Sequence, residues 1–149
     1  MTDAVIVDVD GTLCDVSSVR HFVTGRPKDF DAFHSAAETC PPHTHVLDEV
    51  REHHRAGHRI VVVTARMYRW EQPTRAWLDR HMPVPYTGPF MRGDNDIRAD
   101  VEVKRDIHRI LTRDHGFRIV HCIDDNPEIV ALWAELGITT TVVPGWDAR

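Results

Sequence analysis

The chain has 149 residues, of which 42% are hydrophobic and 28% charged, and its formal net charge is −5 at pH 7. This length and composition predict one globular domain, 1–149, and exclude a disordered polymer. No apolar stretch approaches the ~20 residues of a membrane-spanning helix, so we expect no membrane partner. The acidic balance argues against a general nucleic-acid binder, but it leaves room for a local site that binds an anionic substrate.

The cysteines indicate a reducing compartment. Cys14, Cys40 and Cys122 are odd in number and widely spaced, as in cytosolic proteins that keep free thiols. No basic region precedes the first apolar run, so we expect no secretory signal and a cytoplasmic protein. Cys40 is followed by His43 and His45, but no fourth ligand stands at zinc-finger spacing, so we expect no structural zinc there.

The first half of the chain alternates between apolar runs and a helical pattern. Residues 4–9 (AVIVDV) and 58–65 (HRIVVVTA) are β-branched runs without helical period, which predicts buried strands. An irregular excursion between them contains one short predicted helix at 30–39. The segment 45–57 has the helical period and ends at a glycine. Its predicted inner face consists of Val46, Leu47, Val50 and His54.

The second half continues this alternation. In chain order we predict helix 73–81, a short strand at 89–91, helix 98–116, strand 117–124, helix 126–137 and strand 138–143. Pro73 would stand at the first position of its helix, and Asn126 would cap another. The predicted inner face of helix 98–116 consists of Val103, Ile107, Ile110 and Leu111. Alternating strands and helices predict an α/β fold, a three-layer Rossmann-like parallel sheet of about five strands.

Polar side chains stand at the ends of the predicted strands 4–9, 58–65 and 117–124. A lysine lies in helix 98–116, directly before the last of these strands. Ligands of open parallel sheets bind beyond the carboxyl ends of the strands, so remote segments are expected to meet there. The candidates are Asp8, Asp10, Thr64, Ala65, Arg66, Lys104, Asp124 and Asp125. Hydrolysis of a phosphate monoester needs such a set, because it uses a nucleophile, a proton donor, fixed cations and a divalent metal.

The segment DVDGT (8–12), Thr64, Lys104 and the pair Asp124–Asp125 resemble the four motifs of the haloacid dehalogenase superfamily, phosphatase branch. The segments TAR (64–66), MRGDNDIRADVEVK (91–104) and IDDNPEIVALWAELGI (123–138) are also similar to the phosphatase domain of bacteriophage polynucleotide kinase–phosphatase. This resemblance implies a Mg-dependent enzyme that removes 3′-phosphates from DNA or RNA ends.

The resemblance also implies a role for each matching residue. Asp8 would be the nucleophile, Asp10 would protonate the leaving hydroxyl and then activate water, and Thr64 and Lys104 would hold the phosphate. The implied Mg site consists of Asp8, Asp10, Asp124 and Asp125. The implied substrate-binding residues are Arg20, Ala65, Arg66, Arg92 and Arg98.

Two departures from that family concern the kinase half and the second motif. The 149 residues contain no P-loop pattern, so we expect no kinase activity from them. A separate kinase or ligase in the same pathway is therefore a candidate partner. The motif TAR replaces Ser-Gly-Arg of the family, a change that keeps the hydroxyl and the guanidinium.

The intervals between motifs are too short for a folded cap domain of ~50 residues, so we predict a minimal cap and an open crevice. An open site suits a polymer end, but it also admits nucleotides and other small phosphomonoesters, which stay an alternative. Arg69, Trp70 and Arg75 form a basic–aromatic group for which both base stacking and ordinary packing remain open. His53 and His54 are expected to be ordinary helix surface.

A third interpretation is a non-catalytic domain of the same fold that binds phosphate or metal. The presence of both Asp8 and Asp10 argues against it, because binding alone does not require both carboxylates.

Overall fold

A five-stranded sheet, in which every neighbouring pair of strands is parallel, organises the chain. The computed structural model describes residues 1–146. The strand order is β3-β2-β1-β4-β5, which places β1 at the centre. The strands are β1 (Thr2–Val7), β2 (Arg59–Met67), β3 (Thr87–Arg92), β4 (Phe117–Asp124) and β5 (Thr140–Val142). This is the predicted three-layer α/β architecture.

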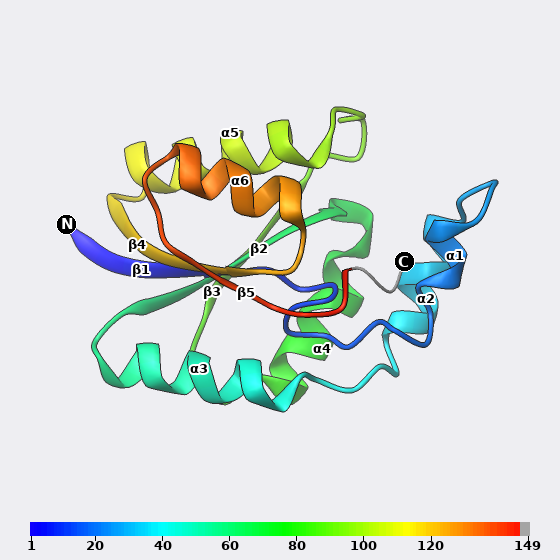
Figure 1. Cartoon of the computed structure of the whole chain (residues 1–149), viewed down its shortest axis with the longest axis horizontal. Helices are drawn as coiled ribbons and strands as arrows, with labels where there is room; N and C mark the ends of the chain where they lie inside the picture. The colour runs from blue at the N-terminus through cyan, green and yellow to red at the C-terminus, as the bar shows by residue number, and fades with distance from the viewer. Residues whose placement is uncertain (147–149) are drawn as a thin grey trace.

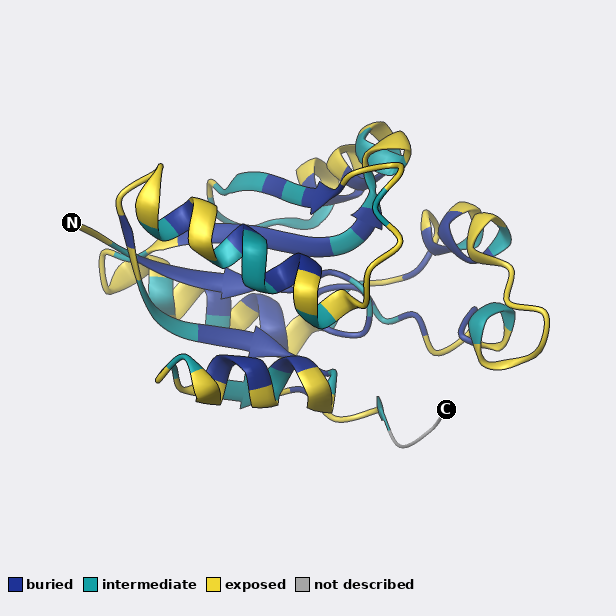
Figure 2. Cartoon of the chain, turned by 90° about the horizontal axis from the view of Figure 1, so that it is seen from above, coloured by how far each residue is buried: buried dark blue, intermediate teal, exposed yellow. Residues whose placement is uncertain are grey.

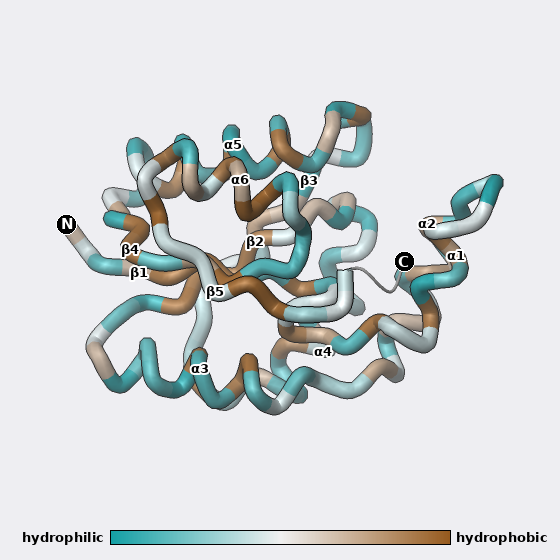
Figure 3. Tube along the Cα trace, in the orientation of Figure 1, coloured by the Kyte–Doolittle hydropathy of each residue, from teal (hydrophilic) through white to brown (hydrophobic). Residues whose placement is uncertain are grey.

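Two helices cover each face of the sheet, as Figure 1 shows. On one face lie α3 (Thr44–Arg55) and α4 (Glu71–His81), and on the other α5 (Asp100–Arg113) and α6 (Pro127–Glu135). The alternation of side chains along β1 explains the two cores: Val5 and Val7 pack on the α3 side, whereas Ala4 and Ile6 pack on the α5 side. Figure 3 shows the hydrophobic segments concentrated along the strands.

The chain between β1 and α3 leaves the sheet at the carboxyl ends of the strands. It carries two short helices, α1 (His21–Thr24) and α2 (Phe30–Ala37), which stand apart from the sheet in Figure 2. Asp29 caps α2 by accepting a hydrogen bond from the backbone N–H of Ala32. A short 3₁₀ helix, η1 (Tyr68–Trp70), joins β2 to α4. These short segments form the small cap that the motif spacing predicts.

The observed elements differ from the predicted ones mainly at their ends. Helix α4 begins at Glu71, so Pro73 is its third residue and not its first. Helical periodicity placed His54 and Ile110 on inner faces, but both are exposed, so both placements are wrong. The separate expectation that His54 lies on the helix surface is confirmed. In each helix, other apolar residues already fill the interface with the sheet. His54 and Ile110 therefore lie outside that interface.

The three cysteines are free and buried, in line with the expectation of unpaired thiols. Among residues 1–146, no helix combines the length and the apolarity that crossing a membrane requires.

Candidate active site

Three carboxylates and one lysine meet at the carboxyl ends of β1 and β4. The Lys104 ammonium, from α5, donates hydrogen bonds to Asp8 Oδ1 at 2.9 Å and to Asp124 Oδ2 at 3.0 Å. Thr12 Oγ1 lies 3.0 Å from Asp8 Oδ2 and 3.4 Å from Asp125 Oδ1, and it donates to these carboxylates. All five side chains are buried. The structure therefore brings the first, third and fourth sequence motifs together.

Gly11 makes this close approach possible. Its φ is +82°, a left-handed conformation that favours glycine, and it turns the chain immediately after Asp10. A Cβ atom at this position would lie 2.0 Å from Asp125 Oδ2. The glycine of the DVDGT segment is thus required both by the turn and by the space that Asp125 occupies.

Asp10 has a separate partner. The Arg66 guanidinium donates to both of its carboxylate oxygens, at 2.9 Å from Nε and 2.5 Å from Nη2. Arg66 Nη1 donates to Thr74 Oγ1 at 2.9 Å, and the Arg66 backbone N–H donates to Thr64 Oγ1 at 3.2 Å. Arg66 is thereby held in one orientation, and with it the carboxylate of Asp10.

The electrostatics of the two carboxylates differ. Burial and the negative charges of Asp124 and Asp125 raise the pKa of Asp8 well above its ordinary value, although Lys104 opposes this. Burial also disfavours the charged form of Asp10, but the charge and hydrogen bonds of Arg66 outweigh burial and lower its pKa. Arg66 thus keeps Asp10 ionised in the resting site.

The other predicted residues lie around this centre. The Arg20 side chain is buried, with Nη2 3.8 Å from Asp125 Oδ2 and Nη1 donating to the Gly145 carbonyl at 2.6 Å. Ala65 lines the cavity, and its carbonyl accepts a hydrogen bond of 3.0 Å from Arg92 Nε. These contacts connect Arg20 to the fourth motif and Arg92 to the second.

Arg92 and Arg98 are both engaged by protein groups. Arg92 also donates to the carbonyls of Asp96 and Arg98 and to the carboxylate of Asp100 at 2.5 Å. Arg98 lies on the exposed rim, paired with Asp96 at 2.8 Å and Asp106 at 2.6 Å. Arg92 therefore ties the segment before α5 to the end of β2.

A cavity of about 590 Å³ joins these groups to residues from the small cap. Asp8, Asp10 and Lys104 form part of its wall. The cap and η1 contribute Val23, Lys28, Phe30, Asp31, Phe33, His34, Arg69 and Trp70. The rings of His34 and Trp70 lie 5.3 Å apart at their centroids. Arg75, on α4, instead donates a hydrogen bond to the Gly88 carbonyl of β3, so it lies apart from Arg69 and Trp70.

The sequence predicted no role for several residues around this site, among them Thr12, Lys28, His34, Thr74 and Asp100. Thr12 belongs to the DVDGT segment, and its contact with Asp8 follows from the turn at Gly11. Thr74 and Asp100 support arginines through side-chain contacts that no local pattern reveals. His34 lies on α2, whose placement over the cavity depends on tertiary packing.

The acidic cluster fits a hard divalent cation. Carboxylate oxygens of Asp8, Asp124 and Asp125 lie within 4.8 Å of one another, and Asp125 Oδ2 is buried with no hydrogen-bond partner among the described residues. Mg²⁺ prefers oxygen ligands and needs only a few from the protein. The side chain of Asp10, which is paired with Arg66, stands outside this cluster, although the sequence resemblance included it among the ligands.

The parallel sheet of order 3-2-1-4-5 and the small cap define an α/β domain of the haloacid dehalogenase-like class. A class C acid phosphatase from Bacillus anthracis, solved with tungstate bound, shares this fold with a TM-score of 0.67 and 15% identity, covering 96% of this chain and 66% of that one. Within this class, residues 2–145 match the polynucleotide kinase PNKP phosphatase domain, and the chain belongs to that family.

Two further relatives are larger proteins. A chain of the Pnkp1/Rnl/Hen1 RNA repair complex matches with 25% identity and a TM-score of 0.75, covering 96% of this chain and 42% of that one. A protein of Autographa californica nuclear polyhedrosis virus, described as a bifunctional polynucleotide kinase/RNA ligase, is 30% identical over 81 residues, which are 54% of this chain and 12% of the viral protein. The chain therefore spans less than half the length of these relatives.

Proposed function

We propose that this domain is a Mg-dependent phosphatase that removes the 3′-phosphate from DNA or RNA ends. The observation that carries the proposal is the buried Lys104 ammonium, which bridges Asp8 and Asp124 at the edge of the sheet in a chain of the polynucleotide kinase phosphatase family. This arrangement supplies a restrained carboxylate nucleophile inside an acidic, cation-binding pocket.

The first step is attack of an Asp8 carboxylate oxygen on the phosphorus atom. The bond from phosphorus to the 3′-oxygen breaks, and an aspartyl-phosphate forms on Asp8. The leaving oxygen takes a proton from Asp10. An arriving phosphate adds negative charge beside Asp10 and competes for Arg66, so it raises the pKa of Asp10 from its lowered resting value and favours the protonated form.

The second step is hydrolysis of the aspartyl-phosphate. Asp10, now a carboxylate, takes a proton from water, the water oxygen attacks phosphorus, and inorganic phosphate leaves Asp8 free. Thr64 and Lys104 are proposed to hold the phosphate oxygens, with Arg66 beside them. Mg²⁺ on Asp8, Asp124 and Asp125 would neutralise phosphate charge. Arg20 is proposed to restrain Asp125 near that cation.

The cavity wall supports a nucleic-acid end as the substrate. Beyond the carboxylates it offers Lys28 and Arg69 for a phosphodiester and the His34–Trp70 ring pair for a base. Arg92 is proposed to act on the substrate by fixing the 96–100 segment at the cavity, with Arg98 on its rim. Since the two larger relatives are a chain of an RNA repair complex and a protein described as a kinase and ligase, a kinase or ligase acting on the product is a fitting partner.

A substrate comparison tests the proposal. Initial rates are measured with Mg²⁺ on a 3′-phosphorylated oligonucleotide, the same oligonucleotide with a 5′-phosphate, a 3′-mononucleotide and an aryl phosphate. We expect the highest kcat/KM for the 3′-phosphorylated oligonucleotide, with DNA and RNA versions compared in parallel. A preference of orders of magnitude for the mononucleotide would make the domain a phosphatase of small phosphomonoesters. No turnover of any substrate would leave only binding.

A further inference from the structure

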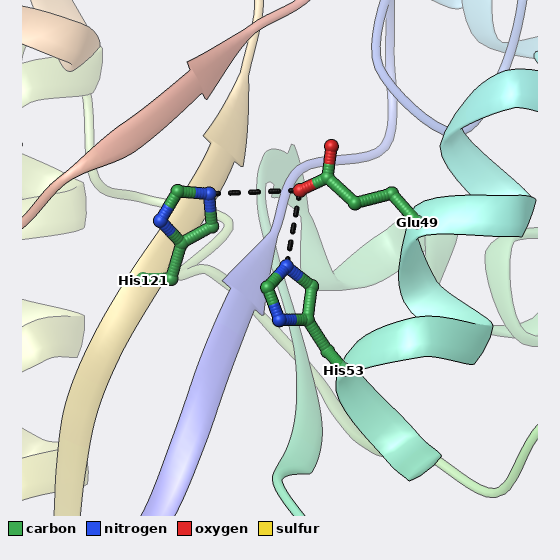
Figure 4. Close-up of side chains that lie close together, drawn as sticks. All are labelled: Glu49, His53 and His121. Carbon is green, nitrogen blue, oxygen red and sulfur yellow. Dashed lines mark hydrogen bonds and ion pairs between the residues drawn. The ribbon is translucent and has the colours of Figure 1, made fainter. Parts of the chain in front are cut away.

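A second group of ligand-type side chains lies on the opposite face of the sheet from Lys104. We propose that Glu49, His53 and His121 form a binding site for Zn²⁺ that fastens helix α3 to strand β4. Figure 4 shows the carboxylate of Glu49 between the two imidazole rings. This site would be chemically distinct from the acidic cluster, because imidazole nitrogens suit zinc whereas carboxylates alone suit Mg²⁺.

The spacing of the three donor atoms matches a zinc site. Glu49 Oε2 lies 3.1 Å from His53 Nε2 and 3.5 Å from His121 Nε2. The three donor atoms all lie within 4.8 Å of one another. A tetrahedral ion with bonds of about 2.0–2.1 Å separates its ligand atoms by about 3.3 Å, so only small side-chain movements would be needed. Two imidazoles and one carboxylate leave the fourth position to water.

The secondary structure holds these ligands in place. Glu49 and His53 are four residues apart on α3 and therefore share one face of the helix. His121 is directed to the same face of the sheet as Ile123, which belongs to the α3-side core, because side chains two apart on a strand point the same way. The side chain of Asp124 points to the opposite face of the sheet, where it contacts Lys104 of α5. The sheet thus separates the two sites.

Two threonines of the edge-strand region orient His121. Its Nδ1 lies 2.7 Å from Thr139 Oγ1, and its Nε2 lies 2.7 Å from Thr141 Oγ1. Thr141 Oγ1 also donates to Glu49 Oε2 at 2.8 Å. Because the Thr141 hydroxyl proton goes to Glu49, His121 Nε2–H donates to Thr141 Oγ1 in the metal-free group. A bound metal would take the place of that Nε2 proton while Nδ1–H donates to Thr139, an arrangement common among metal-bound histidines.

The access of the group is also compatible with zinc. The side chains of Glu49, His53 and His121 are 27%, 21% and 20% exposed, so an ion can enter from solvent. The competing explanation is a hydrogen-bonded group in which Glu49 holds the two histidines without a metal.

Metal titration of the untagged chain separates these explanations. The protein is freed of metal with a chelator and dialysed into excess Mg²⁺, which occupies the acidic cluster. Zn²⁺ is then titrated by calorimetry, and Co²⁺ serves as a spectroscopic probe of tetrahedral coordination. We expect one equivalent of Zn²⁺, a tetrahedral Co²⁺ spectrum, and a higher unfolding temperature with Zn²⁺ than without it.

Matched variants identify the ligands. His53→Gln and His121→Gln should each weaken Zn²⁺ binding by more than about a hundredfold and remove the thermal stabilisation. His54→Gln, on the exposed face of the same helix, and His58→Gln, whose ring lies 5.9 Å from that of His53, should bind as the wild type does. Asp125→Asn should also retain Zn²⁺. Circular dichroism and metal-free unfolding confirm that each variant folds.

The proposal is overturned if the wild type binds no Zn²⁺, or if binding is equal in the wild type and both ligand variants. It is also overturned if His54→Gln or His58→Gln loses as much affinity as His53→Gln, because the ligands would then be elsewhere. None of these readouts depends on phosphatase activity, so the result is independent of the function proposed above.

Discussion

At the scale of single residues, the site assigns different partners to two carboxylates that lie two positions apart in the sequence. Asp8 contacts Lys104 and belongs to the acidic cluster, whereas Asp10 is clamped by Arg66. The difference follows from the turn at Gly11, which directs the two side chains to different neighbours. The proposed nucleophile and proton carrier need unequal surroundings: Lys104 and a bound cation would have to keep Asp8 ionised against the burial that raises its pKa, whereas Asp10 must exchange a proton.

Replacement of the nucleophile tests the first of these roles. Asp8→Asn keeps the size of the side chain but removes the attacking carboxylate, so kcat should fall by more than about a thousandfold. Far-UV circular dichroism should remain that of the wild type. Asp15→Asn, a partly exposed acid on the same connection, is the control and should keep nearly full activity. Turnover by Asp8→Asn near the wild-type rate would exclude Asp8 as the nucleophile.

Arg66→Lys tests the clamp on Asp10. A lysine keeps the positive charge but cannot donate to both carboxylate oxygens and to Thr74 in the same geometry. We expect kcat to fall about a hundredfold, and the acidic limb of the pH–rate profile to move to higher pH, because the pKa of Asp10 rises when the guanidinium is lost. Arg75→Lys on α4 is the matched control. An unchanged pH profile would show that Arg66 does not set the ionisation of Asp10.

His34 gives a prediction for stability against pH. Burial lowers the pKa of this imidazole to about 4, despite the nearby charge of Asp10. Between pH 6.5 and 4 the unfolded chain binds a proton that folded His34 does not, so stability falls as the pH falls through this window. Urea unfolding at pH 7 and pH 4.5 should show a stability loss that is smaller in His34→Gln by about 2–3 kcal/mol. His45→Gln, at an exposed position, should behave as the wild type. Equal losses in all three proteins would contradict a buried neutral His34.

Much of the site could be predicted at this scale, for a physical reason. Asp8 and Asp124 are at or next to strand ends and Thr64 lies in the second half of β2, and the topology of a parallel sheet brings the carboxyl-terminal parts of its strands together whatever the details of packing. The contacts of Thr74 and Asp100 depend instead on the directions of long arginine side chains. Such directions are set by tertiary packing, so sequence spacing did not reveal them.

At the scale of elements, the helices that cover the sheet were easier to predict than the small cap. Helices α3, α5 and α6 carry apolar residues at helical spacing, and their existence followed from that period. Helix α1 has only four residues, none of them buried, and was not predicted. The errors at His54 and Ile110 arose because helical periodicity predicts a buried face that is about one residue wider than the face that packs on the sheet.

The position of α2 and η1 over the cavity predicts a role in substrate selection. Trp70→Ala removes one ring of the His34–Trp70 pair, and base stacking is worth about 1–3 kcal/mol. We expect kcat/KM for a 3′-phosphorylated oligonucleotide to fall about 5- to 150-fold, with little change for an aryl phosphate. Tyr68→Ala, in the same 3₁₀ helix but exposed, is the control. An equal loss on both substrates would indicate that Trp70 only supports the fold.

At the scale of the whole molecule, we expect cation binding and folding to be coupled. Asp8, Asp124 and Asp125 are brought together only in the folded chain, where Lys104 contacts two of these buried carboxyl groups and Arg20 lies near the third. Any ligand that binds only the folded state stabilises it. The fold was predictable because alternating strands and helices permit few topologies, but the cap and the histidine group on the other face required the assembled structure.

Mg²⁺ should therefore raise the unfolding temperature. At a concentration of one hundred times its dissociation constant, the expected gain is about 2.7 kcal/mol. Differential scanning calorimetry with Mg²⁺ and with a chelator measures the effect, which Asp125→Asn should reduce or abolish. Glu128→Gln, a nearby acid on α6 outside the cluster, should respond as the wild type does. An identical response from Asp125→Asn would place the cation elsewhere.

The number of residues in the central strand β1 determines which side chains enter each core and where Asp8 lies. Val5 and Val7 face one core, Ala4 and Ile6 face the other, and Asp8 follows directly. Inserting or deleting one residue there would send each apolar side chain to the wrong layer and turn Asp8 away from Lys104. The number of residues in β1 is therefore fixed by both cores and by the site, whereas the exposed turn between α3 and β2 has neither constraint and should tolerate a change in length.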